Sequence, residues 1–515
     1  MQRQKLELSL TCQKQLKKLV GRGSVRAVDS APTTARMEPR PTLWITCQEP
    51  SHFREKFSGD FAYYKFWTVK ISEIMSTLDS LGASPRKSLG QNFLHDQNLA
   101  SWIVEKLEIE AGDRVVEIGP GLGALTEEIM HCGVSATLLE KDRAFAKYLR
   151  KRFDHAAVEV IEGDALKYDT RIEFLRQPVK IIGNLPYYLS SALLFHFSAD
   201  PCPFTRMVFT VQKEMADRVS AAPGIKAYGS LSVIMQRTWQ VTKLKTLAPS
   251  VFLPQPLVDS VVLLLTRREP RELEETDPIK FSEVVKAGFS ERRKQVRKLL
   301  GRYGDSEMIA AALRAVHLPL TARAEDISLN QWISIVNTLQ PTTVYASDPG
   351  ELLATVDRND QSLIPVDRAT IHREKLLHRA VHIFILNRRG ELLLQKRSYR
   401  KDKFPRRWDS SAAGHVNAGE SYRDCAIREL KEELGITATL TDLGRIPASE
   451  VTGHEFIEIY AGIHDGPVSW NYHEIETCGL FELDMIDLWI DRRPEDFASG
   501  FVECFRSVRG LLAGM

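Results

Sequence analysis

Short apolar runs separated by longer mixed segments dominate residues 115–182. The runs at 115–118, 136–139, 158–161 and 179–182 are rich in Val, Ile and Leu, and each has the length of a buried strand. The segments between them have room for helices, and the first of them predicts a helix over residues 124–130. Strands that alternate with helices predict a mostly parallel sheet covered by helices, so we expect an α/β fold.

Glycines follow the first of these runs. Residues 119–123 are Gly-Pro-Gly-Leu-Gly, and Glu140 ends the second run. Gly119 and Gly121 would let the backbone approach a cofactor closely, and a carboxylate at the next strand end is placed to accept ribose hydroxyl groups. Ala124, which follows the last glycine, also fits a nicotinamide-type site, and an ordinary turn without a ligand is a further alternative.

Polar residues at the ends of the third and fourth runs help to decide which ligand, if any, the glycine turn binds. Asp164 follows the third run, where its carboxylate can accept a hydrogen bond from an exocyclic amine such as that of adenine. The fourth run leads into Asn184-Leu185-Pro186-Tyr187. Alone, this tetrapeptide would indicate a turn at a strand end. At the fourth strand of this layout, it favours an enzyme that methylates adenine.

The chemistry of adenine methylation explains these residue types. An enzyme that methylates the exocyclic nitrogen flips the base out, stacks on it and binds its amino group. Asn184 and the Leu185 carbonyl would accept the amino protons, and Pro186 would stiffen the turn. Tyr187 would offer a ring face to the base. We therefore predict an adenine-N6 methyltransferase that uses S-adenosylmethionine.

Residues 84–339 resemble the ribosomal small-subunit RNA adenine dimethylases. Besides the segments above, the resemblance is carried by SLGQNFL at 88–94, QKE at 212–214, KAYGSLSV at 226–233, FLPQP at 252–256 and VDS at 258–260. It implies a Rossmann-like class I methyltransferase core with a small helical domain. The implied activity is dimethylation of two adjacent adenosines near the 3′ end of 16S (small-subunit) ribosomal RNA, in 30S ribosome biogenesis.

The resemblance also assigns site residues. The catalytic residues are Asn184, Leu185, Pro186 and Tyr187. The cofactor contacts are Asn92, Leu94, Gly119, Gly121, Glu140, Asp164 and Asn184.

A basic segment at residues 290–300 agrees with an RNA partner. It holds five basic residues and one acidic residue, with Val296, Leu299 and Leu300 at helical spacing. The pattern predicts an amphipathic helix whose basic face contacts phosphates, although a solvated helix surface would show the same letters. The expected RNA-binding residues are Arg292, Arg293, Lys294, Arg297 and Lys298.

A second motif spans residues 414–436, with the pattern Gly-x5-Glu-x7-Arg-Glu-Leu-x-Glu-Glu-x-Gly-Ile. Glu429, Glu432 and Glu433 share one helical face, where like charges repel unless a cation lies between them. Hard carboxylate oxygens suit Mg²⁺ or Mn²⁺, which would bridge a diphosphate and orient a water molecule. An acidic solvated face would explain two of these glutamates, but not all the spaced positions.

This pattern is a Nudix box, and the residues from about 356 to 384 resemble the isopentenyl-diphosphate-isomerase-like branch of Nudix proteins. The resemblance implies an α/β/α sandwich around a mixed sheet, with Gly414, Glu420 and Arg428 supporting the metal-binding glutamates. Isomerisation in that branch depends on a cysteine just before the box, where this chain has Ser-Ser-Ala-Ala at 410–413. We therefore expect hydrolysis of a nucleoside or other diphosphate. Glu474 is a candidate for metal binding or general base work, or else a surface glutamate.

Domain boundaries follow from these segments. We expect a catalytic core at 75–267, a helical RNA-contacting domain at 268–340, a turn-rich linker at 341–350 and the Nudix domain at 351–515. We identify no motif in residues 1–74. Their basic start fits an RNA-binding arm or a transit peptide, but we prefer a disordered extension that arises from start-site choice.

Composition adds further expectations. The net charge is +2, and the seven cysteines are scattered without a C-x-x-C pair, so neither a zinc site nor a disulfide framework is indicated. No apolar stretch reaches the ~18 residues of a membrane span. We expect a soluble, cytoplasmic monomer whose partners are the 30S subunit and a small diphosphate, with no membrane partner.

Three hypotheses remain open at this stage. The first is a bifunctional methylase and diphosphohydrolase, because both motif sets are complete. The second is a methylase whose Nudix half serves only as a binding module. The third is a ribosome-assembly factor that does not depend on catalysis.

Overall fold

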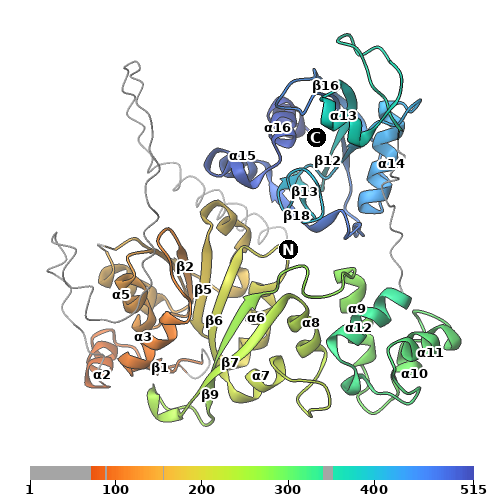
Figure 1. Ribbon diagram of the computed structural model, residues 1–515. Helices are drawn as coiled ribbons and strands as arrows, with labels where there is room; N and C mark the ends of the chain where they lie inside the picture. Colours follow the sequence, from red (N-terminus) through yellow and green to blue (C-terminus); the bar gives the residue numbers. More distant parts are fainter. Residues whose placement is uncertain (1–70, 87–89, 155, 340–351) are drawn as a thin grey trace, which may run out of the picture. The chain divides into compact units, whose positions relative to one another are not determined.

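The computed structural model describes residues 71–86, 90–154, 156–339 and 352–515 (Figure 1). The predictions made for residues 1–70, for Ser88 and Leu89 and for the linker lie outside these ranges. None of the helices in the described part of the chain has the length and apolar character needed to cross a bilayer.

A seven-stranded sheet forms the core of the N-terminal part. Its strands are β2 (Arg114–Ile118), β3 (Ser135–Glu140), β4 (Val158–Glu162), β5 (Val179–Asn184), β6 (Phe204–Gln212), β7 (Trp239–Leu247) and β9 (Ser260–Arg267). They are arranged in the order β4-β3-β2-β5-β6-β9-β7. Strands β2 to β6 are parallel, and β9 is antiparallel to both of its neighbours. This sheet confirms the mostly parallel α/β fold.

The parallel register brings the carboxyl ends of the central strands to one edge. Ile118 pairs with Leu139 on one side and with Gly183 on the other. The glycine turn after β2, together with Glu140 and Asn184 at the ends of β3 and β5, therefore lies at that edge, where doubly wound sheets bind their ligands.

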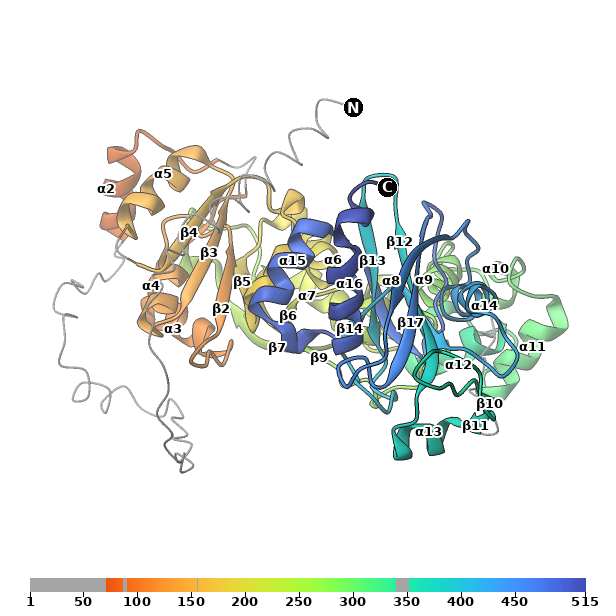
Figure 2. The same ribbon diagram turned by 90° about the horizontal axis from the view of Figure 1, so that it is seen from above.

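Helices flank this sheet (Figures 1 and 2). They are α2 (Ile71–Ser80), α3 (Gln97–Glu105), α4 (Ala124–His131), α5 (Arg143–Arg152), α6 (Ser190–Ser198), α7 (Lys213–Val219) and α8 (Ser230–Thr238). A short ribbon of β1 (Phe93–Leu94) and β8 (Phe252–Leu253) lies beside them. The helix predicted over residues 124–130 is α4.

Helix α2 crosses the predicted boundary between residues 74 and 75. Ile74 and Leu78 are four residues apart, so they share one helical face. Both are buried, and they pack with Phe93, Leu122 and Phe145. The folded chain therefore includes residues 71–74, which the sequence pattern assigns to the extension.

A small helical unit follows β9. It consists of α9 (Pro278–Gly288), α10 (Val296–Leu299), α11 (Ser306–Ala315) and α12 (Leu329–Leu339). Its core contains Phe281, Leu313 and Trp332, all of them buried. A Cβ on Gly288 would lie 2.4 Å from a carbon of the Trp332 ring, so glycine is required where these two helices meet.

The helix predicted over the basic segment at 290–300 is wrong for its first half. Only α10 is helical, and the residues before it form turns. Gln295 makes an isolated β-bridge with Arg323, and the Val296 amide donates to the Ala322 carbonyl. Residues 290–295 carry no apolar side chain that could bury a helix face, and a short helix without such packing is unstable.

A second seven-stranded sheet forms the C-terminal part, and it is mixed. Its strands are β12 (His378–Leu386), β13 (Glu391–Arg397), β14 (Trp408–Asp409), β15 (Ala412–His415), β16 (Thr441–Ile446), β17 (Glu455–Ile463) and β18 (Ile475–Glu482). β12 is parallel to β17 and antiparallel to β13 and β15. The strands β10 (Leu352–Leu353) and β11 (Val366–Asp367) form a separate hairpin-like pair.

Helices cover both faces of the mixed sheet. They are α13 (Arg368–Glu374), α14 (Tyr422–Leu434), α15 (Leu483–Arg492) and α16 (Ser499–Leu512). Val381, Ile383 and Ile385 of β12 belong to the same core cluster as α14, whereas Phe384 contacts Phe501 of α16. Because successive side chains of a strand point to opposite faces, α14 and α16 lie on opposite sides, as Figure 2 shows. This confirms the predicted α/β/α sandwich.

Candidate active sites

The glycine turn after β2 has the backbone geometry that the sequence predicts. Gly119, Gly121 and Gly123 all have positive φ, at 63°, 57° and 86°. A Cβ on Gly121 would lie 3.0 Å from the Phe93 ring, and one on Gly123 would lie 2.9 Å from the Phe153 ring. Side chains at these positions would strain the turn and displace the rings that close it.

Glu140 ends β3 and faces this turn. Its carboxylate accepts hydrogen bonds from the Gly121 amide at 3.1 Å and the Asp142 amide at 2.8 Å. Burial raises the pKa of Glu140 to about 7, against the opposing effect of the two amides. An acceptor that is already held in place can bind ribose hydroxyls without reorganising.

Asp164 lies one strand further along, after β4. It caps a short 3₁₀ helix by accepting from the Leu166 amide at 3.1 Å, and it forms an ion pair with Lys141 at 2.9 Å. Although partial burial works in the opposite direction, these donors hold the pKa of Asp164 below its usual value. Asp164 is therefore an ionised acceptor at the rim of the cavity.

Asn184 is the last residue of β5. Its amide nitrogen donates to the Asn92 carbonyl at 2.8 Å, so its Oδ1 is the atom left for a ligand. That oxygen is buried and has no hydrogen-bond partner within the described structure. A buried unpaired acceptor is costly, which points to a donor supplied by a ligand.

The rest of the tetrapeptide holds Asn184 in place. Leu185 is buried, and its amide donates to the Thr210 carbonyl on β6 at 3.0 Å. The Pro186 carbonyl accepts from the Leu189 amide, which forms a tight turn. The Tyr187 hydroxyl lies 2.6 Å from the Ser260 hydroxyl. This contact anchors one end of the Tyr187 ring.

One cavity joins these groups. It is lined by all of the predicted cofactor residues, namely Asn92, Leu94, Gly119, Gly121, Glu140, Asp164 and Asn184. Pro186 also lines it, whereas Leu185 and Tyr187 do not. Tyr188, which the sequence analysis left out, lines the cavity with 56% of its surface exposed.

Glu117 is a second cavity residue that sequence reasoning missed. It lies within β2, and the hydroxyl of Thr126 donates to it at 2.6 Å. Burial raises its pKa to about 8. A carboxyl buried in an apolar strand, where a hydrophobic residue is expected, is the signal that would have found it.

The predicted RNA-binding cations are spread around a turn. Arg292, Arg293, Lys294 and Lys298 are exposed and Arg297 is half-buried. Arg292 pairs with Glu325 at 2.8 Å and Lys294 pairs with Glu291 at 2.7 Å. Acidic neighbours therefore offset part of the positive charge of this segment.

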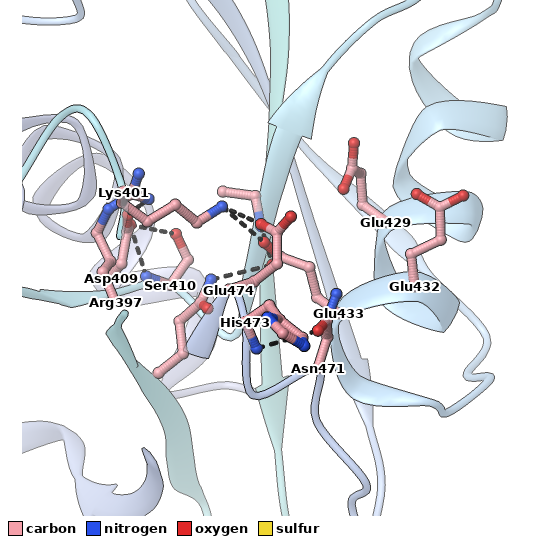
Figure 3. Close-up of polar contacts among 12 residues, drawn as sticks. Arg397, Lys401, Asp409, Ser410, Glu429, Glu432, Glu433, Asn471, His473 and Glu474 are labelled. Atoms are coloured by element: carbon pink, nitrogen blue, oxygen red, sulfur yellow. Dashed lines mark hydrogen bonds and ion pairs between the residues drawn. The ribbon is translucent and has the colours of Figure 1, made fainter. Parts of the chain in front are cut away.

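Helix α14 carries the three glutamates of the second motif. Ser421 caps its start by accepting from the Asp424 amide, and Gly435 ends it with a φ of 67°. Figure 3 shows Glu429, Glu432 and Glu433 on the same side of this helix. Burial raises the pKa of Glu429 to about 8 and that of Glu433 to about 7. Neighbouring carboxylates add to the rise, so this face is suited to a cation.

The supporting residues of the motif contact these glutamates directly. A Cβ on Gly414 would collide with the Glu429 side chain, so glycine lets the strand and helix approach. Arg428 donates to Glu429 at 2.8 Å, to Glu432 at 3.0 Å and to Glu420 at 2.9 Å. Glu420 in turn accepts from the Asn417 amide, which fixes the preceding loop.

Two loops outside the motif complete this site (Figure 3). Glu474 forms an ion pair with Lys401, whose Nζ lies 3.9 Å from Glu433 Oε1. The other oxygen of Glu433 accepts from Gln395 at 3.0 Å and from the Ala413 amide at 3.1 Å. Lys401 therefore faces the one Glu433 oxygen that these donors leave open. The sequence pattern singled out Glu474 but not Lys401.

Three histidines form a further cluster in the C-terminal part. The ligand atoms of His372, His378 and His415 lie within 4.8 Å of one another. The Nδ1 of His378 donates to the Leu376 carbonyl at 2.9 Å, so the buried Nε2 is the ring atom left to face the cluster. Glu455 Oε1 lies 3.4 Å from both His378 and His415.

This histidine cluster has the chemistry of a transition-metal site. Burial lowers the pKa of His372 to about 3 and that of His415 to about 4, so both rings are neutral at physiological pH. Neutral imidazoles with a nearby carboxylate are typical zinc ligands. His415 lies 37 residues after His378 in the sequence, which is why spacing alone did not reveal the cluster.

Zinc uptake tests this cluster. We expect the wild-type chain to bind an equimolar amount of Zn²⁺ and His378→Ala to lose it, because the preoriented Nε2 is removed. Competition with a chromogenic chelator measures the affinity. His196→Ala, in the N-terminal part, is the control. Equal zinc affinity of the wild type and His378→Ala would contradict the assignment.

Glu117→Gln should alter how stability depends on pH. The carboxyl of Glu117 has a pKa of about 8 in the folded chain, against an ordinary value of 4.5. The unfolded chain therefore releases this proton first, so the wild type loses stability relative to the variant as the pH rises between these values, by a few kcal/mol at most. Urea unfolding across this range, with the exposed Glu105→Gln as a control, measures the effect. A stability difference that does not change with pH would contradict the burial argument.

Comparison with known proteins agrees with both sites. The profile of the family described as ribosomal RNA adenine dimethylase matches residues 82–341, and the NUDIX domain profile matches residues 376–498. The ribosomal RNA small subunit methyltransferase A of Leptothrix cholodnii is 38% identical over 261 residues, covering 50% of this chain and 93% of that protein. Its namesake from Bacillus thuringiensis is 36% identical over 273 residues, covering 51% and 94%.

The family match spans half of the chain, and the relatives are matched along nearly their whole length. The NUDIX match lies entirely beyond it. The chain therefore belongs to the ribosomal RNA adenine dimethylase family and carries a NUDIX domain fused to its C-terminal side.

Proposed function

We propose that the protein transfers methyl groups from S-adenosylmethionine to the N6 atoms of two adjacent adenosines near the 3′ end of small-subunit ribosomal RNA. The observation that carries this proposal is the buried, unpaired Oδ1 of Asn184. It lies in the same cavity as Glu140 and Asp164. An acceptor in this position suits the amino group of a flipped adenine.

The cavity residues fit the cofactor. S-adenosylmethionine supplies a methyl group on a positively charged sulfur, together with a ribose, an adenine and an amino acid end. Glu140 would accept the ribose hydroxyls, and Asp164 would accept the adenine amine. Glu117 is the buried acid closest to the glycine turn in sequence, and we assign it to the cationic amino acid end, because a buried carboxyl is stabilised in its charged form by a cation.

The tetrapeptide would then orient the base. Asn184 Oδ1 would accept one amino proton of the adenine, which would leave the nitrogen lone pair available to the methyl group. Tyr187 is anchored by Ser260, and Tyr188 lies exposed at the cavity. Either ring can stack on a flipped base, and such stacking contributes about 1–3 kcal/mol per base.

The RNA would be held by phosphates and shape. The exposed cations among Arg292, Arg293, Lys294, Arg297 and Lys298 are candidates for phosphate contacts. Because Arg292 and Lys294 already have acidic partners, we assign most of the phosphate contacts to Arg293 and Lys298. We place the protein in the cytoplasm, as a monomer that acts on the 30S subunit.

We further propose that the NUDIX domain hydrolyses a nucleoside or other diphosphate with Mg²⁺ or Mn²⁺. Glu429, Glu432 and Glu433 would hold the metal, which supplies charge stabilisation and an activated water. Residues 410–413 contain no cysteine, which favours hydrolysis over isomerisation. We assign to Glu474 the role of accepting the proton of the attacking water, which it would take once Lys401 pairs with a phosphate.

Asn184→Ala tests the methylase assignment. We expect methyl transfer to small-subunit RNA to fall on the order of 100-fold, because the amino group loses its buried acceptor, while cofactor binding is largely retained. Filter-bound radiolabel from S-adenosylmethionine measures transfer, and calorimetry measures binding. The exposed Asn98→Ala serves as the matched control. If Asn184→Ala methylated at the wild-type rate, the proposed orientation of the base would be wrong.

Glu433→Gln tests the hydrolase assignment. We expect metal-dependent phosphate release from a panel of nucleoside diphosphates to fall on the order of 100-fold, because a buried metal ligand loses its charge. Mn²⁺ affinity, followed by electron paramagnetic resonance, should fall in parallel. The exposed Glu450→Gln should behave like the wild type. Unchanged Mn²⁺ affinity would instead support a NUDIX half that only binds its ligand or another protein.

A further inference from the structure

The N-terminal and C-terminal parts contact each other within one compact unit. Phe174, in the 3₁₀ helix after β4, is buried against three aromatic rings of the C-terminal part. Its ring centroid lies 4.9 Å from that of Trp489, 5.6 Å from Trp408 and 5.9 Å from Phe481. Buried aromatic clusters of this kind anchor stable interfaces.

A second contact involves Glu275, in the segment between β9 and α9. Arg400 donates to Glu275 Oε1 at 3.0 Å, and His473 Nδ1 lies 3.1 Å from Glu275 Oε2. The Glu275 side chain is only 15% exposed. One carboxylate from the methyltransferase part therefore joins two loops of the NUDIX domain.

Those two loops are the ones that complete the NUDIX site. Arg400 precedes Lys401, and His473 precedes Glu474. The loops are also joined by the Ser398 amide, which donates to the Glu474 carbonyl at 2.8 Å. A shift of either loop would move Lys401 or Glu474 relative to Glu433.

Glu275 is fixed on its other side by the helical RNA-contacting unit. Asn337 of α12 donates to the Glu275 carbonyl at 2.8 Å and to Glu274 at 3.0 Å. Ser334 of the same helix donates to Glu274 at 3.1 Å. A continuous chain of polar contacts thus runs from α12 through Glu275 to the NUDIX loops.

We infer that Glu275, which lies outside the NUDIX fold, is a positioning residue for the NUDIX site and links its occupancy to the helical RNA-contacting unit. This inference rests on the proposed metal and diphosphate site. Glu275 touches no reacting atom and acts through Arg400 and His473. By thermodynamic reciprocity, a ligand that orders the loops also stabilises α12, and RNA bound at the helical unit favours the ordered loops.

Hydrogen exchange of the full chain tests this inference. The probes are Mn²⁺ and inorganic diphosphate, and the variants are Glu275→Gln and Glu269→Gln. Glu269 is the matched control, because it also pairs across the interface, with Arg406 at 3.4 Å, but is 72% exposed. Without probe, we expect Glu275→Gln to speed amide exchange in residues 398–402 and 471–475 on the order of tenfold, with Glu269→Gln unchanged.

The change in hydrogen exchange of α12 on addition of the probes measures the coupling between the NUDIX site and the helical unit. In the wild type and Glu269→Gln, the probes should slow exchange in both loops and in residues 334–339. In Glu275→Gln the slowing should be confined to the loops. The methylation rate of Glu275→Gln, which we expect to be retained, shows that the variant is folded.

The outcomes separate this inference from the proposed function. Equal basal exchange in Glu275→Gln and the wild type, an α12 response that survives in Glu275→Gln, or equal effects of both substitutions would each overturn the role of Glu275. If Mn²⁺ and diphosphate left amide exchange in the wild-type loops unchanged, this result would instead overturn the proposed NUDIX site. The basal comparison between variants would still decide whether Glu275 holds the loops.

Discussion

Buried carboxyl groups that need a cation are the constraint on which both sites of this protein depend. In the methyltransferase cavity, Glu117 and Glu140 have raised pKa values because the surrounding sheet excludes water. In the NUDIX domain, burial raises the pKa values of Glu429 and Glu433 in the same way. A buried carboxylate is costly when it is charged and unpaired, and in our proposal Glu117, Glu429 and Glu433 each gain a positive partner, whereas Glu140 accepts from two backbone amides and from ribose hydroxyls. A sulfonium cofactor and a divalent metal are such partners.

The two folds meet this constraint differently. In the methyltransferase part, parallel strands bring the ends of β2, β3 and β5 to one edge, so acidic and amide groups from distant segments converge. In the NUDIX domain, a single helix carries three glutamates on one face, and Gly414 lets a strand pass close to it. The first arrangement suits an extended organic cofactor, and the second suits a small ion.

Much of this could be predicted from the sequence, because strand runs and their terminal residues are local features. The strands β2 to β5 and the helix α4 follow from such patterns, whereas the mixed sheet of the NUDIX domain was implied by the family resemblance. The prediction of a helix over 290–300 was wrong for its first half. The spacing of the charged residues is helical, but residues 290–295 carry no apolar side chain that could pack against the rest of the unit. Glu117, Lys401 and the His372, His378 and His415 cluster were missed because their meaning depends on burial and long-range proximity.

The fused arrangement adds contacts that neither family pattern contains. Phe174 anchors one part to the other, and Glu275 reaches the loops that carry Lys401 and Glu474. The interface therefore combines an aromatic core with a charged contact at a functional loop. In the coupling that we infer, this contact lets each domain respond to the ligand of the other, which would give a physical reason for both to remain on one chain.

The most direct measurement of the central claim is the chemical identity and position of the transferred methyl groups. The purified chain would be incubated with radiolabelled S-adenosylmethionine and small ribosomal subunits that lack methylation, and the digested RNA would be separated into nucleosides and mapped. We expect N6,N6-dimethyladenosine at two adjacent positions near the 3′ end. Cofactor binding without transfer, or label in a nucleoside other than N6-methylated adenosine, would contradict the assignment of this chain as a small-subunit RNA adenine dimethylase.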